Sequence, residues 1–140
     1  MRAVVQRVAS ASVAVDGERV AGIGSGLLVL LGVHESDDEP VADRMADKLL
    51  ALRIFEDDEG RMNRAAADVG AEIMCVSNFT VYGDARRGNR PSFTQAARPE
   101  PAQALYERVR ERLGAQGGVF GAHMHVELVN DGPVTLVVEL

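Results

Sequence analysis

The sequence offers few side chains that could act as a nucleophile or carry a proton. A Ser-His-Asp or Cys-His system needs a base within reach of the nucleophile, and the chain has three histidines. His34 stands before an acidic segment, where a surface role is the commoner one. Ser77 and Thr80 follow a buried apolar run, but the sequence indicates no base for either hydroxyl. We therefore expect Thr80 to be a hydrogen-bonding residue, and a nucleophilic Thr80 remains the alternative.

The candidates for metal binding are equally sparse. His123 and His125 are two residues apart, so on a strand they share a face and could bind zinc if a third ligand converged. The acidic turn at residues 56–60 resembles a calcium loop only weakly, because no further ligand spacing follows. Cys75 lies in an apolar run and is interpreted as a small core residue in a reducing compartment. We expect no metal and no cofactor.

Backbone groups are the stronger candidates for chemistry. Residues 130–135, Asn-Asp-Gly-Pro-Val-Thr, form a turn signal between two apolar runs. An X-Pro bond adopts the cis form at a modest cost, so the carbonyls beside Pro133 could be held as a rigid pair of acceptors for an ammonium group. A hydrolase with so few bases would work through an oxyanion hole. The N–H groups of Phe79 and Thr80 would be its donors.

Composition limits the classes of function. A chain of 140 residues predicts one domain, residues 1–140, with its own core. A net charge of −6 argues against broad neutralisation of nucleic acid phosphates. The exception is a Gly/Pro-rich loop that holds Arg86, Arg87 and Arg90, the best candidates for an anion contact. No signal peptide or membrane span is visible, so we expect a cytoplasmic protein with no membrane partner.

Strands dominate the pattern of elements. Asp16-Gly17 is a hairpin signal, and the Leu/Val run at 27–31 is typical of a central strand buried on both faces. The apolar run of residues 71–76 leads directly into Ser77. The predicted strands are residues 2–8, 11–15, 19–23, 27–31, 53–55, 71–76, 122–129 and 134–139.

Two helices complete the prediction. Asp38 is an N-cap candidate and Pro40 suits a first turn, which predicts a helix with an apolar stripe from Val41 to Leu52. A second helix is predicted for residues 99–113, and the mixed charges on its outer face indicate a solvated surface, with nucleic-acid contact as the alternative. The fold class is therefore α+β, a mainly antiparallel, barrel-like sheet with two packed helices.

Three motifs in this order resemble the D-aminoacyl-tRNA deacylase family. They are residues 77–80 (Ser-Asn-Phe-Thr), residues 87–93 (Arg-Gly-Asn-Arg-Pro-Ser-Phe) and residues 130–135. Residues 5–8, 26–33 and 53–55 are also similar to that family, so the resemblance covers essentially the full chain.

The resemblance implies a metal-free homodimer that hydrolyses the ester between a D-amino acid, or glycine, and the terminal adenosine of tRNA, with no role for DNA. It implies a cis Gly132–Pro133 bond whose carbonyls engage the substrate ammonium and reject an L side chain. That loop would enter the partner's active site, and the tRNA 2′-hydroxyl would assist catalysis. The implied catalytic stretch is Ser77, Asn78, Phe79 and Thr80; the implied substrate-binding residues are Gly132, Pro133, Val134, Thr135, Phe120 and Met124; Arg86, Arg87 and Arg90 are weaker candidates for tRNA contact.

One position departs from the family pattern, because Asn78 stands where Gln is more common. A role for this side chain is therefore open, and the position could act through its backbone alone. Two rival functions also stay open. One is a binding module of the same fold that holds an amino acid or nucleotide without turnover, and the other is a small esterase.

Overall fold

The sheet is organised around its first strand. The computed structural model describes residues 1–140, and β1 (Arg2–Val15) pairs antiparallel with β2 (Glu18–Ile23), β3 (Gly26–Gly32) and β7 (His125–Glu139). The two predicted N-terminal strands are thus one strand, with register shifts against β7 between Gln6 and Ser10. The Asp16-Gly17 hairpin is confirmed as the connection between β1 and β2.

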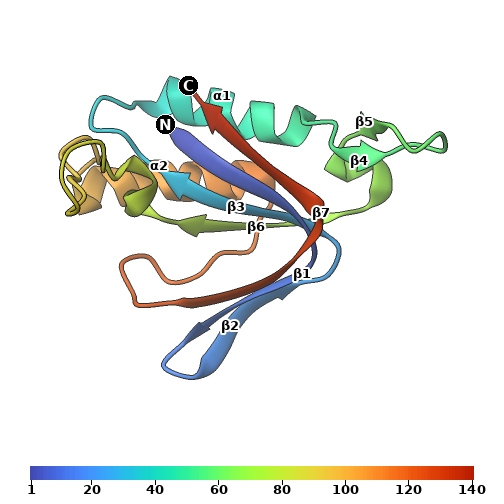
Figure 1. Ribbon diagram of the computed structural model, residues 1–140, viewed down its shortest axis with the longest axis horizontal. Helices are drawn as coiled ribbons and strands as arrows, with labels where there is room; N and C mark the ends of the chain where they lie inside the picture. The colour runs from blue at the N-terminus through green and yellow to red at the C-terminus, as the bar shows by residue number, and fades with distance from the viewer.

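The predicted central strand is confirmed as β3, in which nearly every residue is buried. On its other edge β3 pairs in parallel with β6 (Glu72–Ser77), so the sheet is mixed although most of its pairs are antiparallel. The strong curvature of the sheet, visible in Figure 1, gives it the shape of a half-barrel. The α+β class predicted from the sequence is confirmed.

Both helices cover one face of the sheet (Figure 1). Helix α1 (Glu39–Ala51) begins where predicted, because Asp38 accepts a hydrogen bond from the N–H of Val41 and caps the first turn. Helix α2 (Pro99–Leu113) has the predicted bounds. Alternate residues of β3 divide the core: Leu27, Val29 and Leu31 pack with the helices, and Leu28 packs in a smaller cluster on the opposite face of the sheet.

The C-terminal prediction of two strands around a loop was wrong. Strand β7 is a single element from His125 to Glu139, and residues 130–135 lie within it. The register against β1 shifts at this point, since Asn130 is opposite Val8 but Thr135 is opposite Gln6. The turn residues therefore form a bulged segment of a paired strand.

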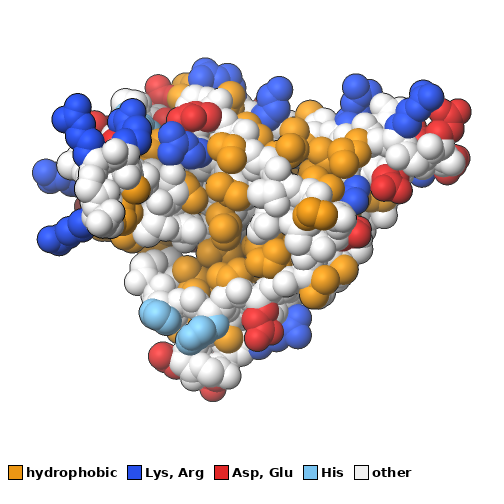
Figure 2. Space-filling view, in the orientation of Figure 1, with side chains coloured by type: hydrophobic (Ala, Val, Ile, Leu, Met, Phe, Trp, Pro, Cys, Tyr) orange, Lys and Arg blue, Asp and Glu red, His pale blue; other side chains and the backbone are white.

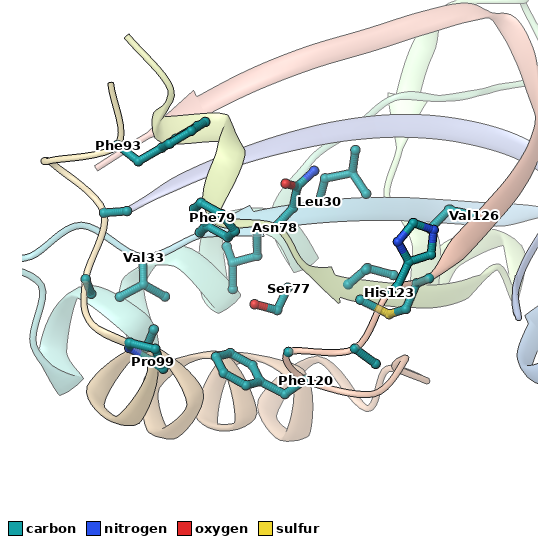
Figure 3. A pocket seen from close by; sticks show the side chains of 18 residues that line it. Leu30, Val33, Ser77, Asn78, Phe79, Phe93, Pro99, Phe120, His123 and Val126 are labelled. Atoms are coloured by element: carbon teal, nitrogen blue, oxygen red, sulfur yellow. The ribbon is translucent and has the colours of Figure 1, made fainter. Parts of the chain in front are cut away.

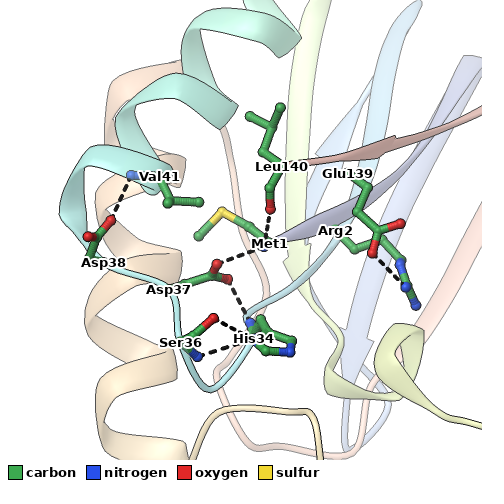
Figure 4. A network of polar contacts seen from close by, with 9 residues as sticks. All are labelled: Met1, Arg2, His34, Ser36, Asp37, Asp38, Val41, Glu139 and Leu140. Carbon is green, nitrogen blue, oxygen red and sulfur yellow. Dashed lines mark hydrogen bonds and ion pairs between the residues drawn. The ribbon is translucent and has the colours of Figure 1, made fainter.

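The two ends of the chain meet where β1 begins and β7 ends (Figure 4). The amine of Met1, which is buried, donates to Asp37 Oδ1 at 2.8 Å and to the carbonyl of Leu140 at 2.9 Å. Arg2 bonds Glu139 at 2.7 Å and holds the pKa of that carboxyl below its ordinary value. These contacts fix the last residues of β7 beside the start of β1.

The remaining elements are short. They are β4 (Phe55–Glu56), β5 (Met62–Arg64), η1 (Ala66–Val69) and η2 (Phe79–Tyr82). Strand β4 begins at the end of the strand predicted for residues 53–55 and pairs only with β5, in a small separate sheet. None of the helices has the length and apolar character that crossing a membrane would require.

Candidate active site

An apolar cavity of about 610 Å³ opens at the carboxyl ends of β3 and β6. Its walls come from these strands, from the start of η2, from residues 93–102 and from the segment 120–126 that leads into β7. Figure 3 shows Phe79, Phe93 and Phe120 around this space, with Ser77 at its floor. Of its 18 lining residues only His123 has an ionisable side chain, so the cavity holds almost no acid–base chemistry of its own.

The cavity brings together part of the predicted site. Five predicted site residues line it, namely Ser77, Asn78, Phe79, Phe120 and Met124. Two further residues line the cavity. Phe93 meets Phe79 edge to face at 5.2 Å between ring centroids, and His123, which the sequence offered only as a metal-ligand candidate, meets His125 at 5.2 Å. Phe93 belongs to one of the three family motifs, but only the arginines of that motif were named as candidate contacts, and no signal in the sequence paired Phe93 with Phe79.

Thr80 does not line the cavity. Its hydroxyl donates to Asn78 Oδ1 at 2.5 Å, and its N–H donates to the same oxygen at 3.2 Å. An amide oxygen takes up no proton at neutral pH, so this contact holds the hydroxyl without activating it. The geometry gives no support to a nucleophilic Thr80.

Close packing fixes the approach of η2 to the sheet. A Cβ added at Gly32 would lie 2.2 Å from Val81 Cγ2 and 3.3 Å from the carbonyl oxygen of Asn78. The N–H of Asn78 donates to the carbonyl of Leu31 at 2.8 Å. Glycine at the end of β3 therefore lets residues 78–82 pack directly on the strand.

Cys75 is a core residue, as predicted. It is fully buried under α2, and burial raises the pKa of its thiol to about 12. Its carbonyl accepts a hydrogen bond from the hydroxyl of Tyr106 at 2.8 Å. A thiol that stays protonated is a poor nucleophile, so Cys75 helps to position α2 behind the cavity.

The segment 130–135 is braced by side chains. Asn130 accepts from the N–H of Val134 at 2.8 Å and donates to its carbonyl at 3.1 Å. The peptide bond between Gly132 and Pro133 is cis. Gly132 has φ of +150°, and a Cβ there would come within 2.6 Å of the Val134 nitrogen. Only glycine fits this position without moving the backbone.

Arg7 of β1 anchors the same segment through hydrogen bonds. Its guanidinium donates to the carbonyl of Asp131 at 3.0 Å and to that of Ile54 at 2.8 Å, and the residue is 7% exposed. Sequence reasoning missed this role, although period two along β1 places Arg7 on the buried side with Ala3 and Val5.

The segment 130–135 does not meet the cavity of its own chain, and none of its residues lines the cavity. Along β1, Asn130 is opposite Val8, whereas Ser77 is level with Leu31 and hence with Ala3. The level of Asn130 is roughly 17 Å from that of Ser77 at the usual rise of a strand, and the level of Thr135, which is opposite Gln6, is roughly 10 Å from it. The loop and the cavity are therefore two separate features of one chain.

The three predicted tRNA-contact arginines differ in their surroundings. Arg86 forms a bidentate pair with Asp84, at 2.9 and 2.6 Å, which lowers the pKa of that carboxyl to about 2. Arg87 and Arg90 are exposed and have no ion pair. These two carry the unneutralised charge of the loop.

The arginines of α2 are also occupied. Arg108 and Arg112 make bidentate pairs with Asp43 and Asp47 of α1. The sequence left nucleic-acid contact through this helix face as an alternative. The structure argues against it, because these two arginines are already paired with carboxylates. No group of three or more His, Cys, Asp or Glu side chains is placed to hold a metal ion.

Comparisons with known proteins agree over the whole chain. The family model described as D-Tyr-tRNA(Tyr) deacylase matches residues 4–139. A protein of Symbiobacterium thermophilum named D-aminoacyl-tRNA deacylase is 56% identical, over 99% of this chain and 95% of its own length. One of Anaeromyxobacter dehalogenans with the same name is 58% identical, over 99% of this chain and 97% of its own.

Two solved structures share the fold. One titled c-Myc DNA Unwinding Element Binding Protein superposes with a TM-score of 0.95 at 41% identity, covering 100% of this chain and 99% of that one. One titled as a probable eukaryotic D-amino acid tRNA deacylase gives 0.84 at 17% identity, covering 99% and 98%, and supports the fold alone. With the family model and full-length relatives above 50% identity, the chain belongs to the D-Tyr-tRNA(Tyr) deacylase family.

Proposed function

We propose that this protein hydrolyses the ester bond of D-aminoacyl-tRNA and releases the free D-amino acid and tRNA. The observation that carries the proposal is the cavity at the ends of β3 and β6, which is lined by the family motif at residues 77–79. Its apolar walls suit an aminoacyl group and the face of a terminal adenosine.

Catalysis in this proposal uses backbone donors and the substrate itself. Water attacks the ester carbonyl, and the N–H of Phe79 stabilises the oxyanion that forms. The carbon–oxygen bond to the ribose then breaks, and the released ribose oxygen takes up a proton. The tRNA 2′-hydroxyl assists the proton transfer. The shortage of ionisable side chains around the cavity supports such a division of work.

Chirality is selected by the Gly132–Pro133 segment of a partner subunit. Its carbonyls receive the substrate ammonium and leave no room for an L side chain, and by the same logic glycyl-tRNA is also a substrate. The separation of the segment from the cavity of its own chain supports delivery by a second copy. Exposure supports it as well, since Gly132 and Pro133 both reach the surface.

The surface of β7 supports a homodimer. Strand β7 pairs only with β1, so its other edge has no partner strand, and Val129 and Val137 are 57% and 65% exposed. Leu128 and Leu136 add to this apolar surface, and Figure 2 shows a broad apolar area on the face that carries β7. A long, exposed apolar edge strand is unstable against association unless it is covered.

The acceptor end of tRNA is the macromolecular partner. Arg87 and Arg90 are the proposed phosphate contacts, with Arg86 weaker because Asp84 neutralises it. We expect the reaction in the cytoplasm, where tRNA is charged. We propose no role for DNA, a metal or a cofactor.

The test is chiral. Purified protein is incubated with D-tyrosyl-tRNA, L-tyrosyl-tRNA and a simple D-tyrosine ester. The proposal predicts release from D-tyrosyl-tRNA alone. Equal rates on both tRNAs, or protection of D-tyrosyl-tRNA without turnover, would refute it; the second result would favour the binding module. Fast turnover of the simple ester would revive the esterase.

A further inference from the structure

Asn78 marks the point where this chain departs from the more common Gln, and its side chain has a defined set of contacts. One oxygen, Oδ1, accepts both the N–H of Thr80 at 3.2 Å and its hydroxyl at 2.5 Å. We propose that Asn78 is a positioning residue for the proposed hydrolysis: it ties Thr80 to the end of β6 and so leaves the N–H of Phe79 as the donor to the scissile carbonyl. This inference rests on the proposed function.

The contacts divide the backbone donors of this stretch. The N–H of Thr80 is occupied by Asn78 Oδ1, and that of Val81 by the carbonyl of Asn78 at 3.4 Å. Phe79 lies between them, and no side chain accepts its N–H. Of the two donors expected from the sequence, Phe79 and Thr80, Asn78 therefore leaves only the first for a substrate.

The position of Asn78 makes this a matter of geometry at the cavity wall. Asn78 and Phe79 both line the cavity, and Figure 3 shows them side by side along one edge. The backbone of Asn78 is fixed on the other side by its own N–H, which donates to Leu31. With the backbone anchored at residue 78 and the side chain anchored at residue 80, the peptide between residues 78 and 79 has little freedom.

The length of the side chain is decisive for this arrangement. An Asn side-chain oxygen can accept the N–H of the residue two positions later, which closes a small hydrogen-bonded ring. This is why Asn, Asp and Ser are favoured immediately before a helix and Gln is not. The extra methylene of Gln places its amide beyond that ring. Asn78 therefore takes a local role that the longer side chain does not fill in the same way.

The experiment separates positioning from folding by comparing Asn78→Ala with Asn78→Ser. Ser is neutral and can accept the N–H of Thr80, whereas Ala cannot. Steady-state kcat and KM are measured on D-tyrosyl-tRNA, with thermal unfolding of each variant alongside. Gln103→Ala, which removes an exposed amide from α2, is the matched control.

For Asn78→Ala we expect kcat to fall about tenfold or more and KM to change less than about threefold. The reason is that a displaced Phe79 N–H stabilises the transition state less well but affects the binding of the substrate little. Asn78→Ser should recover most of that loss. Thr80→Val keeps the backbone N–H and should lose less than Asn78→Ala. If Asn78→Ala does not fold, the Ser and Val variants still decide.

Three results would overturn the inference. They are an unchanged or higher kcat in Asn78→Ala, a loss of kcat in Asn78→Ser as large as in Asn78→Ala, and a raised KM in Asn78→Ala with kcat unchanged. Turnover by the wild-type protein is the separate control. If the wild type releases no D-tyrosine, the proposed function fails first; if it does and Asn78 has no effect, only the positioning role fails.

Discussion

Single residues hold the segment 130–135 in place. Arg7 shows this best, because one buried guanidinium donates to two carbonyls from segments that are distant in sequence, at Ile54 and Asp131. The sequence located the Gly132–Pro133 motif through its turn chemistry. It could not identify the buried partner, because a lone Arg in a strand is more often exposed.

Replacing Arg7 with Met should destabilise the fold by about 2–3 kcal/mol, because two carbonyls lose a charged donor in a buried site. Deacylation should fall more than the unfolded fraction explains, since the loop backbone at Asp131 is released. Urea unfolding and kcat measurements check both effects. Arg112→Met, at an exposed ion pair, is the control. Unchanged unfolding in Arg7→Met would contradict the anchoring role.

Asp84 should weaken the binding of tRNA by the basic loop, because it neutralises Arg86. Its pKa of about 2 keeps the carboxylate ionised throughout the working pH range, so it neutralises Arg86 there. Asp84→Asn retains an oxygen for the N–H of Arg86 but removes the charge. We predict a lower KM for tRNA and a steeper dependence of log KM on log salt, by about one unit, as for one added phosphate contact. A KM that rises or stays constant would argue against contact by this loop.

At the scale of elements, both helices and the buried central strand followed from apolar spacing and capping residues. The bounds of β7 did not, because Gly-Pro ends a strand in most contexts. Here pairing with β1 continues on both sides of the motif, so tertiary contacts override the local turn signal. The cavity was not predictable either, since it depends on how η2 and the segment 120–126 pack around the strand ends.

Gly32 tests whether the close approach of η2 shapes the site. In Gly32→Ala the new methyl group meets Val81 and must push η2 away from β3. We expect kcat to fall by about tenfold or more, with a smaller loss of stability. Gly24→Ala, where the nearest atom to a Cβ is 3.6 Å away, should retain activity and serves as the control. Equal activity in both variants would show that η2 has room to move.

The ion pairs between α1 and α2 should be sensitive to acid. Arg108 lowers the pKa of Asp43 through a hydrogen bond, so the pair stabilises the fold above the unfolded pKa near 4 and loses this effect as pH falls through the lower folded value. Asp43→Asn should therefore reduce Tm by a few degrees at most at pH 7 and by less at pH 3. A difference in Tm that grows on acidification would contradict this sign.

For the whole molecule, composition and the three motifs predicted the fold class and the family, and the structure added the separation of loop and cavity within one chain. A single domain over residues 1–140 and a homodimer both stay predictions. The sequence alone could not show the separation, because it arises from the register of β7 on β1 and of β3 on β6. It makes the second subunit a requirement of the proposed mechanism.

The most direct test of that requirement combines two defective subunits. Ala97→Trp fills the cavity of its own chain, and Gly132→Val distorts the loop through the clash with Val134. Each variant should be inactive as a homodimer. In a mixed dimer, the intact cavity of one subunit meets the intact loop of the other.

Deacylation of D-tyrosyl-tRNA is therefore measured after subunit exchange, with mixed dimers isolated through two different tags. Randomly mixed subunits should recover about a quarter of wild-type activity, because half of the dimers are mixed and each has one complete site. The isolated mixed dimers should recover about half. Mixed dimers that form but remain inactive would contradict the account.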